Sequence, residues 1–147
     1  MLYHSQIAKG SYILIIRLPE QQTIKISSRR AFHLSPGCYA YVGSAMGGFK
    51  PRLSRYFQGS RKPHWHIDYL LQRAFISSII LCETKERVEC IIAQALSSQF
   101  SSVPGFGSSD CRCRSHLFFA AEEGQMKSTI MAALSRLALE PKLVKYI

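Results

Sequence analysis

The stretch Gly10-Ser11-Tyr12-Ile13-Leu14-Ile15-Ile16-Arg17-Leu18 decides the fold class that we expect for this chain. It is rich in β-branched residues and is followed by Pro19, a composition and a boundary that are typical of a strand. Because side chains alternate between the two faces of a strand, every second residue shares a face. The shared face is predicted to carry Tyr12, Leu14, Ile16 and Leu18.

Outward from this strand, the chain mixes strand and helix patterns. Short strands are predicted over residues 23–26, 39–42, 76–82 and 116–120, with a short terminal strand or tail at 143–147. Helices are predicted from Pro51 onward and over residues 64–74, 83–99 and 125–139. Because regular βαβ repetition is missing, we expect an α/β (α+β) fold in which helices flank a small mixed or antiparallel central sheet.

The composition indicates a basic globular protein. Its 147 residues are 47% hydrophobic and 19% charged, so we expect a single domain over residues 1–147. The formal net charge of +10 favours a nucleic acid or another anionic surface as partner. The longest apolar run, near residues 13–16, is too short to span a membrane, and the first residues lack the regions of a secretory signal. We therefore expect a cytoplasmic protein whose five cysteines are thiols.

The positive charge is concentrated in one window of the sequence. Between Glu20 and Asp68 there are eight Lys or Arg residues and no carboxylate. A basic segment without neutralising acids suits a phosphate backbone, so the expected partner is nucleic acid, and DNA in particular. The candidate phosphate contacts are Lys50, Arg55, Arg61, Lys62 and His66.

Two tyrosine motifs, an arginine-bearing helix and a later glutamate follow one another along the chain. They are Gly10-Ser11-Tyr12, Tyr41-Val42-Gly43, Arg52-Leu53-Ser54-Arg55-Tyr56-Phe57 and Glu89. In this order they resemble the motifs of the GIY-YIG nuclease superfamily. Further segments resemble an uncharacterised archaeal and bacterial branch of that superfamily, which is sometimes fused to a base-excision endonuclease. These segments are His64-Trp65-His66-Ile67-Asp68-Tyr69-Leu70-Leu71, Phe106-Gly107-Ser108-Ser109-Asp110-Cys111 and His116-Leu117.

The resemblance implies a metal-dependent endonuclease that hydrolyses phosphodiester bonds in DNA, in repair or in the processing of branched DNA. Tyr12 would act as the general base or assist it, and Tyr41 would orient the water or the phosphate. Arg52 would clamp the non-bridging phosphate oxygens with its planar guanidinium. Glu89 would hold a single Mg²⁺ or Mn²⁺. Because a free tyrosine titrates at about 10, Tyr12 would need a lowered pKa or a proton-relay partner, for which His64 and His66 are the candidates.

The chain departs from the family pattern in three places. Ser11 stands where the first motif has isoleucine. Tyr12 and Tyr41 are 29 positions apart, which implies an extra hairpin between their strands. The family's late asparagine has no clear counterpart, and this keeps open a non-catalytic nucleic-acid-binding module on the same fold. Because small members of the family often take their specificity from attached domains, a separate repair protein is a further expected partner.

The segment Cys111-Arg112-Cys113-Arg114-Ser115-His116 allows a different interpretation, a zinc-stabilised interaction domain. Its spacing is not that of the usual structural zinc motifs, and it cannot fill four coordination positions by itself. His64 or His66 would complete the set; otherwise Cys111 and Cys113 form a buried thiol pair. His64 also stands four residues before Asp68, and these two form either a hydrogen-bonded pair on a helix or part of a cleft.

Overall fold

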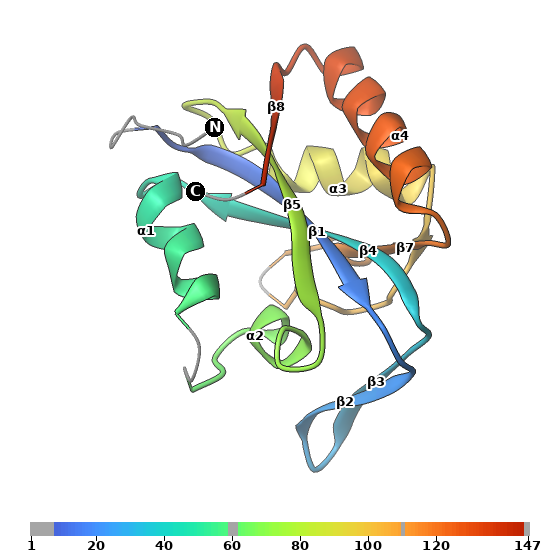
Figure 1. Cartoon of the computed structure of the whole chain (residues 1–147). Helices are drawn as coiled ribbons and strands as arrows, with labels where there is room; N and C mark the ends of the chain where they lie inside the picture. The colour runs from blue at the N-terminus through green and yellow to red at the C-terminus, as the bar shows by residue number, and fades with distance from the viewer. Residues whose placement is uncertain (1–7, 59–61, 110, 146–147) are drawn as a thin grey trace.

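The computed structural model describes residues 8–58, 62–109 and 111–145. Within these residues the core is a six-stranded sheet in the order β6-β7-β4-β1-β5-β8, and all its neighbouring strands are antiparallel (Figure 1). The central strand β1 (Gly10–Leu18) lies between β4 (Gly37–Ala45) and β5 (Phe75–Glu83). The expected α+β class is therefore confirmed, and the sheet is antiparallel rather than mixed.

The remaining elements are shorter than these three strands, apart from the last two helices. The outer strands of the sheet are β6 (Ser101–Ser102), β7 (Leu117–Ala120) and β8 (Pro141–Val144), and β2 (Gln22–Ser27) pairs with β3 (Arg30–Leu34) in a separate hairpin. The helices are α1 (Phe49–Ser54), which continues into the 3₁₀ turn η1 (Arg55–Phe57), α2 (His66–Leu70), α3 (Glu89–Ser97) and α4 (Glu123–Arg136).

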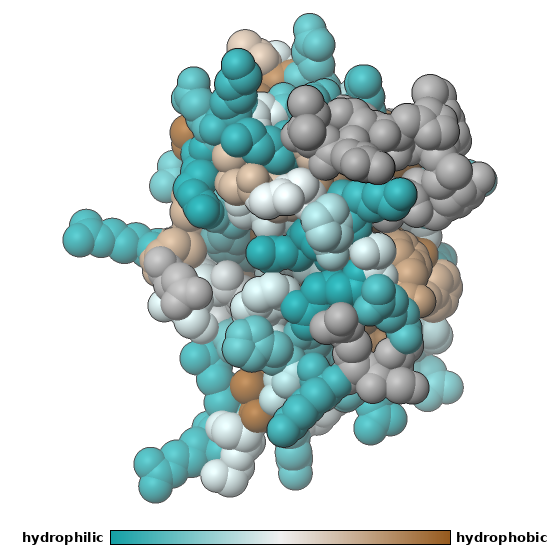
Figure 2. Space-filling model, turned by 90° about the vertical axis from the view of Figure 1, so that its left-hand side faces the viewer, coloured by the Kyte–Doolittle hydropathy of each residue, from teal (hydrophilic) through white to brown (hydrophobic). Residues whose placement is uncertain are grey.

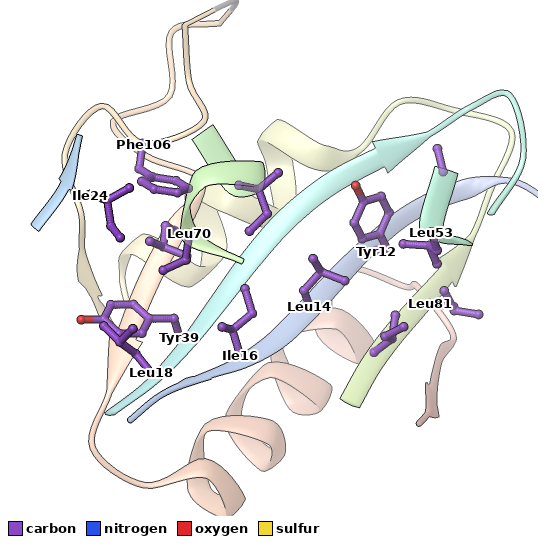
Figure 3. Close-up of a cluster of buried hydrophobic side chains, with 14 of the residues drawn as sticks. Tyr12, Leu14, Ile16, Leu18, Ile24, Tyr39, Leu53, Leu70, Leu81 and Phe106 are labelled. Carbon is purple, nitrogen blue, oxygen red and sulfur yellow. The ribbon is translucent and has the colours of Figure 1, made fainter. Parts of the chain in front are cut away.

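Alternation along β1 divides the core into two halves. Tyr12, Leu14, Ile16 and Leu18 lie on one face of the sheet, as predicted, together with buried residues of α1 and α2 (Figure 3). Ile13 and Ile15, which lie between them, point to the other face and pack with buried residues of α3 and α4. In Figure 1, α1 and α2 lie on one side of the sheet, and α3 and α4 lie on the other. Tyr12 therefore faces the same layer as the helix that carries Arg52.

The β2–β3 hairpin is the insertion that the spacing of the two motif tyrosines predicted. Its inward residues Ile24 and Phe32 are buried in the first half of the core. The Arg30 guanidinium donates a hydrogen bond of 2.9 Å to the carbonyl oxygen of Gly105. The hairpin extends from one end of the six-stranded sheet (Figure 1), and the bond from Arg30, directly after its turn, fastens the turn end to the loop that contains Gly105.

The helix predicted over residues 64–74 is shorter than the pattern suggested. Asp68 Oδ2 accepts hydrogen bonds from the main-chain N–H groups of His64 and Trp65, at 2.9 Å and 2.8 Å. This capping places the beginning of α2 at His66, because an acidic side chain satisfies free N–H groups at a helix start. The expected pairing of His64 with Asp68 therefore exists, but through the main chain of His64 rather than its ring.

The helix predicted over residues 83–99 also begins later, at Glu89. β5 continues to Glu83, and the Thr84 hydroxyl accepts the N–H of Glu86 in the turn that follows, which competes with helix formation. The buried residues of α3 are Ile92, Ala93 and Leu96, whereas Ile91 is 51% exposed.

The surface on the α1 side is mainly hydrophilic, with hydrophobic side chains in small separate areas (Figure 2). Among the described residues, no helix is long and apolar enough to cross a membrane.

Candidate active site

Tyr12 is a buried residue of β1 with its hydroxyl aimed at a neighbouring helix. Its cross-strand partner is Gly43, and a Cβ at position 43 would come within 2.5 Å of Tyr12 Oη, so only glycine leaves room for the ring. The Tyr12 hydroxyl is 2.6 Å from the Tyr56 hydroxyl, a hydrogen-bonding distance. Burial, together with the phenols of Tyr56 and Tyr41, raises the pKa of Tyr12 well above its ordinary value.

Tyr41 approaches the same region from β4. Its ring makes an edge contact with Phe106, with 6.2 Å between the ring centroids. Burial, followed by the charges of Tyr56 and Glu89, raises the pKa of Tyr41 as well. The fold therefore does not lower the pKa of Tyr12. The hydrogen-bonding partner of Tyr12 is Tyr56, and neither of the two histidines expected from the sequence, His64 and His66, takes this place.

Arg52 and Arg55 share one aromatic ring but differ in their partners. The guanidinium carbon of Arg52 lies 4.5 Å from the centroid of the Trp65 ring, and that of Arg55 lies 4.2 Å from it. Arg55 also forms an ion pair with Asp68 at 2.8 Å, and both side chains are largely buried. Arg52 has no carboxylate partner among the described residues and borders a cavity. Arg52 is thus positioned by stacking while its N–H groups remain available to an anion.

Glu89 is the first residue of α3, and it borders the same cavity as Tyr12 and Tyr41. Its side chain is 25% exposed, and its Oε1 lies 3.9 Å from the Arg87 guanidinium, which is 72% exposed. At that distance and exposure, the contact with Arg87 is weak. A partly exposed carboxylate with so weak a partner is able to bind a hydrated divalent cation.

These four residues border one cavity of about 360 Å³. Tyr12 comes from β1, Tyr41 from β4, Arg52 from α1 and Glu89 from α3, so the fold collects them from four separate elements. Trp65 and Arg87 add an aromatic and a second cationic group to the same lining. A cavity with a guanidinium, two phenols and a carboxylate can bind a phosphate and a divalent metal ion together.

The other predicted catalytic and phosphate-contacting residues lie outside this lining. His64 is exposed, with its ring against the edge of Trp65 at a centroid distance of 5.3 Å. Lys50 and Lys62 are exposed at the surface, and Arg61 falls outside the described residues. Arg55 is held by its ion pair with Asp68. None of these positions supports direct contact with a phosphate in the cavity, so their proposed contacts with nucleic acid stay predictions.

His66 stabilises a loop instead of reaching the cavity. Its Nδ1 accepts a hydrogen bond of 2.9 Å from the main-chain N–H of Gly107. Its ring packs against Phe32 and Phe106, at centroid distances of 5.3 Å and 5.5 Å. Burial, and next the charge of Arg30, lower the pKa of His66, so the ring is neutral and free to accept that hydrogen bond. Gly107 has a φ of +71°, which favours glycine at this position.

A second group of side chains near the cavity consists of potential metal ligands. The ligand atoms of Cys90, Cys111, Cys113 and His116 all lie within 4.8 Å of one another, an arrangement that could hold a metal ion. Cys90, Cys111 and His116 also border the cavity itself. Burial and the neighbouring thiols raise the pKa of Cys113 to about 12. The fourth member of this group is Cys90 of α3, so the expectation that His64 or His66 completes it is wrong for the described residues.

Sequence reasoning missed several residues that help to form the site. Tyr56 was named only within the arginine-bearing motif, but it stands one turn after Arg52 and its hydroxyl reaches Tyr12. Trp65 appeared only as part of a motif, and Arg87 and Cys90 were not singled out at all. Helical spacing from Arg52 was the available signal for Tyr56. For Cys90 no local signal exists, because its partners lie more than twenty positions later in the chain.

Comparison with known proteins gives a family but no relative of known structure. Neither the curated proteins nor the solved structures contain a significant match to this chain. A family model, described as Domain of unknown function DUF123, matches residues 11–139, which include every element from β1 to α4 and the residues that border the cavity. The chain therefore belongs to the DUF123 family.

Proposed function

We propose that this protein is a metal-dependent endonuclease of the GIY-YIG type that hydrolyses phosphodiester bonds in DNA, in repair or in the processing of branched DNA. The observation that carries the proposal is the convergence of Tyr12, Tyr41, Arg52 and Glu89 on one cavity of about 360 Å³. These four residues come from four separate elements, and each one is a residue to which the sequence resemblance gives a catalytic role.

Arg52 is suited to bind the phosphate. Stacking on Trp65 fixes the plane of its guanidinium, and no carboxylate of the described residues neutralises it. A planar fork of N–H donors matches the non-bridging oxygens of a phosphodiester, whose negative charge grows as the attacking water approaches. Arg55 stacks on the same Trp65 ring and pairs with Asp68, so it helps to hold the ring against which Arg52 lies.

The Tyr12–Tyr56 pair is suited to orient the attacking water. In hydrolysis the water oxygen bonds to phosphorus and gives up a proton, the bond to the leaving sugar oxygen breaks, and that oxygen takes up a proton. When Tyr12 donates its hydrogen to Tyr56 across 2.6 Å, a lone pair of Tyr12 Oη is left to accept a hydrogen bond from the water. Tyr12 thereby assists the general base by orienting the water, and Tyr41 offers a second hydroxyl at the cavity for the phosphate.

Glu89 fits the requirements of a Mg²⁺ or Mn²⁺ ligand. These cations prefer oxygen ligands and usually bind through one or two carboxylates, with substrate phosphate and water filling the other positions. The Glu89 carboxylate borders the cavity and is partly exposed, so such additional ligands have access to it. When bound, the cation would neutralise charge on the phosphate and support the leaving oxygen.

The surface charge favours a long polyanion over a small phosphate ester. Lys50 and Lys62 are exposed near the ends of the segment that carries Arg52, and the hairpin adds Lys25, Arg29 and Arg30. Such groups contact the backbone of DNA without reading its sequence, and their contribution falls steeply with salt. Selection of a particular DNA structure would then come from a separate repair protein.

Cleavage of labelled single-stranded, duplex, flapped and four-way DNA in Mg²⁺ or Mn²⁺ tests the proposal. The variants are Glu89→Gln and Arg52→Ala, with the exposed residues Glu86→Gln and Arg73→Ala as matched controls. We expect metal-dependent cutting by the wild type and both controls, and loss of cutting with retained DNA binding in the two site variants. Equal cutting by Glu89→Gln and the wild type would exclude the proposed metal ligand.

A second candidate, a non-catalytic nucleic-acid-binding module, is favoured by one observation. Burial raises the pKa values of both motif tyrosines, so neither is a phenolate at neutral pH. Salt-sensitive DNA binding without cutting of any substrate, in either metal, would select this module.

A further inference from the structure

We infer that Cys90, Cys111, Cys113 and His116 form a structural zinc site that fastens the beginning of α3 to the loop before β7. This metal site goes beyond the proposed nuclease function and does not depend on it. Its ligands are three thiols and one imidazole, a set that selects Zn²⁺, whereas Mg²⁺ prefers a set made of oxygen ligands.

The distances between the donor atoms suit tetrahedral coordination. Zn–S bonds of about 2.3 Å and Zn–N bonds of about 2.0 Å place neighbouring donors roughly 3.5–3.8 Å apart. The four donor atoms lie within 4.8 Å of one another, and Cys111 Sγ is 3.3 Å from His116 Nε2. Closing on a cation therefore needs only small movements of side chains.

The hydrogen bond on the far side of the histidine ring fixes the nitrogen that faces the thiols. His116 Nδ1 lies 3.1 Å from the carbonyl oxygen of Val42, and a carbonyl oxygen only accepts, so Nδ1 carries the hydrogen. Nε2 of the neutral ring then presents its lone pair toward Cys111. A backbone carbonyl that orients the second nitrogen is the usual support of a metal-binding histidine. The histidine is 4% exposed, so this orientation is imposed by packing.

The position of the group explains what a metal would do for the fold. Residues 103–116 connect β6 to β7, and their described part contains no helix or strand, which makes this a long connection for a compact protein. At its end, the His116 carbonyl oxygen accepts the Val42 N–H of β4 at 2.9 Å, and Cys90 belongs to α3 on the other face of the sheet. One ion would join these segments. Because Cys90 directly follows Glu89, the same ion would fix the place of Glu89 at the cavity.

Neither a disulfide nor a buried thiol pair would use the whole group. A disulfide would join two of the three thiols and leave the third, and it would make no use of the oriented histidine. A thiol pair of Cys111 and Cys113 would not require a third cysteine from a distant helix to complete the group. A metal ion uses all four side chains.

Metal content and cobalt spectroscopy test the inference. The purified chain, freed of loosely bound metal, is compared with Cys113→Ala and with Cys38→Ala, which also removes one thiol but from buried β4. We expect about one zinc per chain in the wild type and in Cys38→Ala, and at least a tenfold loss in Cys113→Ala. The metal-free wild type should give thiolate-to-cobalt charge-transfer bands on addition of Co²⁺. Absence of both zinc and these bands in the wild type overturns the inference, as does equal loss of zinc in both variants.

Measurements on the wild type alone guard against misfolding of a variant. With zinc bound, Cys90, Cys111 and Cys113 should resist alkylation, and removal of the metal by a chelator should expose all three. Hydrogen exchange should then accelerate in the first turn of α3 and in residues 103–116, while α4 stays unchanged. Equal exchange in both states would overturn the fastening role. A Glu89→Gln variant should keep its zinc, so failure of the nuclease proposal and failure of this one give different results.

Discussion

The cavity has two borders of different construction. The tyrosine–arginine border, formed by Tyr12, Arg52 and Trp65, is held by strand pairing, by ring stacking and by the hydrogen bond between the Tyr12 hydroxyl and that of Tyr56 behind it. The cysteine–histidine border, formed by Cys90, Cys111 and His116, joins the start of a helix to a long loop. On the first border, regular strands and helices hold the side chains in place. On the second, contacts between side chains must hold a long loop in place. The two borders should therefore respond differently to substitution, to chelators and to pH.

The largest difference is expected between the two arginines that share Trp65. Arg52→Ala should lower the cleavage rate by roughly 10²–10³-fold, as loss of one charge-stabilising donor does, with little change in stability. Arg55→Ala should instead lower the free energy of unfolding by about 3 kcal/mol, because it leaves the Asp68 carboxylate largely buried without its cation. Cleavage assays and urea denaturation of both variants measure the two effects. If both variants lose the same property, the assignment of separate roles fails.

A smaller effect is expected from crowding the central tyrosine. Gly43→Ala would place a Cβ within 2.5 Å of Tyr12 Oη, inside van der Waals contact. We expect a loss of about 1–3 kcal/mol in the free energy of unfolding, as for other overpacked cores. Gly47→Ala, where a Cβ meets no atom within 4 Å, is the matched control and should change stability by less than about 0.5 kcal/mol. A thermal or urea titration in which both variants match the wild type would contradict the packing of Tyr12 over Gly43.

Removing the Tyr56 hydroxyl tests what its hydrogen bond with Tyr12 contributes to cleavage. Tyr56→Phe should slow cleavage by up to about tenfold, the equivalent of one neutral hydrogen bond, because Tyr12 loses the acceptor for its hydrogen. Tyr69→Phe, which changes a partly buried tyrosine of the same core half that does not border the cavity, is the control and should cut at the wild-type rate. Single-turnover rates separate an effect on cleavage from a change in DNA binding. A faster or unchanged rate in Tyr56→Phe would remove Tyr56 from the mechanism.

The smallest effect concerns Tyr39, on the same sheet face but away from the cavity. Its hydroxyl donates a hydrogen bond of 2.6 Å to the Ser35 carbonyl oxygen, and burial raises its pKa to about 12. The fold thus favours the protonated form, and its contribution to stability is complete below about pH 10 and is lost as the pH rises from about 10 to 12. Stability measured by urea titration should fall less steeply over this range in Tyr39→Phe. An identical slope in the variant and the wild type would contradict the raised pKa.

The same contrast explains how far the sequence could predict the molecule. Alternation along residues 10–18 predicted the faces of β1 correctly, because successive side chains of any strand point to opposite faces of the sheet. The gap between Tyr12 and Tyr41 predicted the hairpin. Periodicity could not find the start of α3, since a hydroxyl of Thr84 competes with the helix. Cys90 could not be connected to Cys111, because that contact depends on how α3 packs on the sheet.

The site was predictable where its residues lie on regular elements. Tyr12, Tyr41 and Arg52 were placed on the correct strands and helix, and with Glu89 they meet at the cavity. The histidine partner expected for Tyr12 was wrong, because the hydroxyl beside Tyr12 is that of Tyr56, in the 3₁₀ turn that follows α1; Phe57 of the same turn is 50% exposed. A change of helix type over three residues has no reliable signal in a single sequence.

The place of β1 in the sheet also has a consequence for synthesis. This strand leaves the ribosome before its partners, yet it pairs with β4 on one side and with β5, which ends at Glu83, on the other. Until β5 has emerged, the nascent chain carries an apolar strand with one open hydrogen-bonding edge, which other chains can recognise. Pairing between such distant segments is slow, because a long loop must close first. A product truncated before β5 should therefore aggregate, and no smaller folded version of this protein is expected.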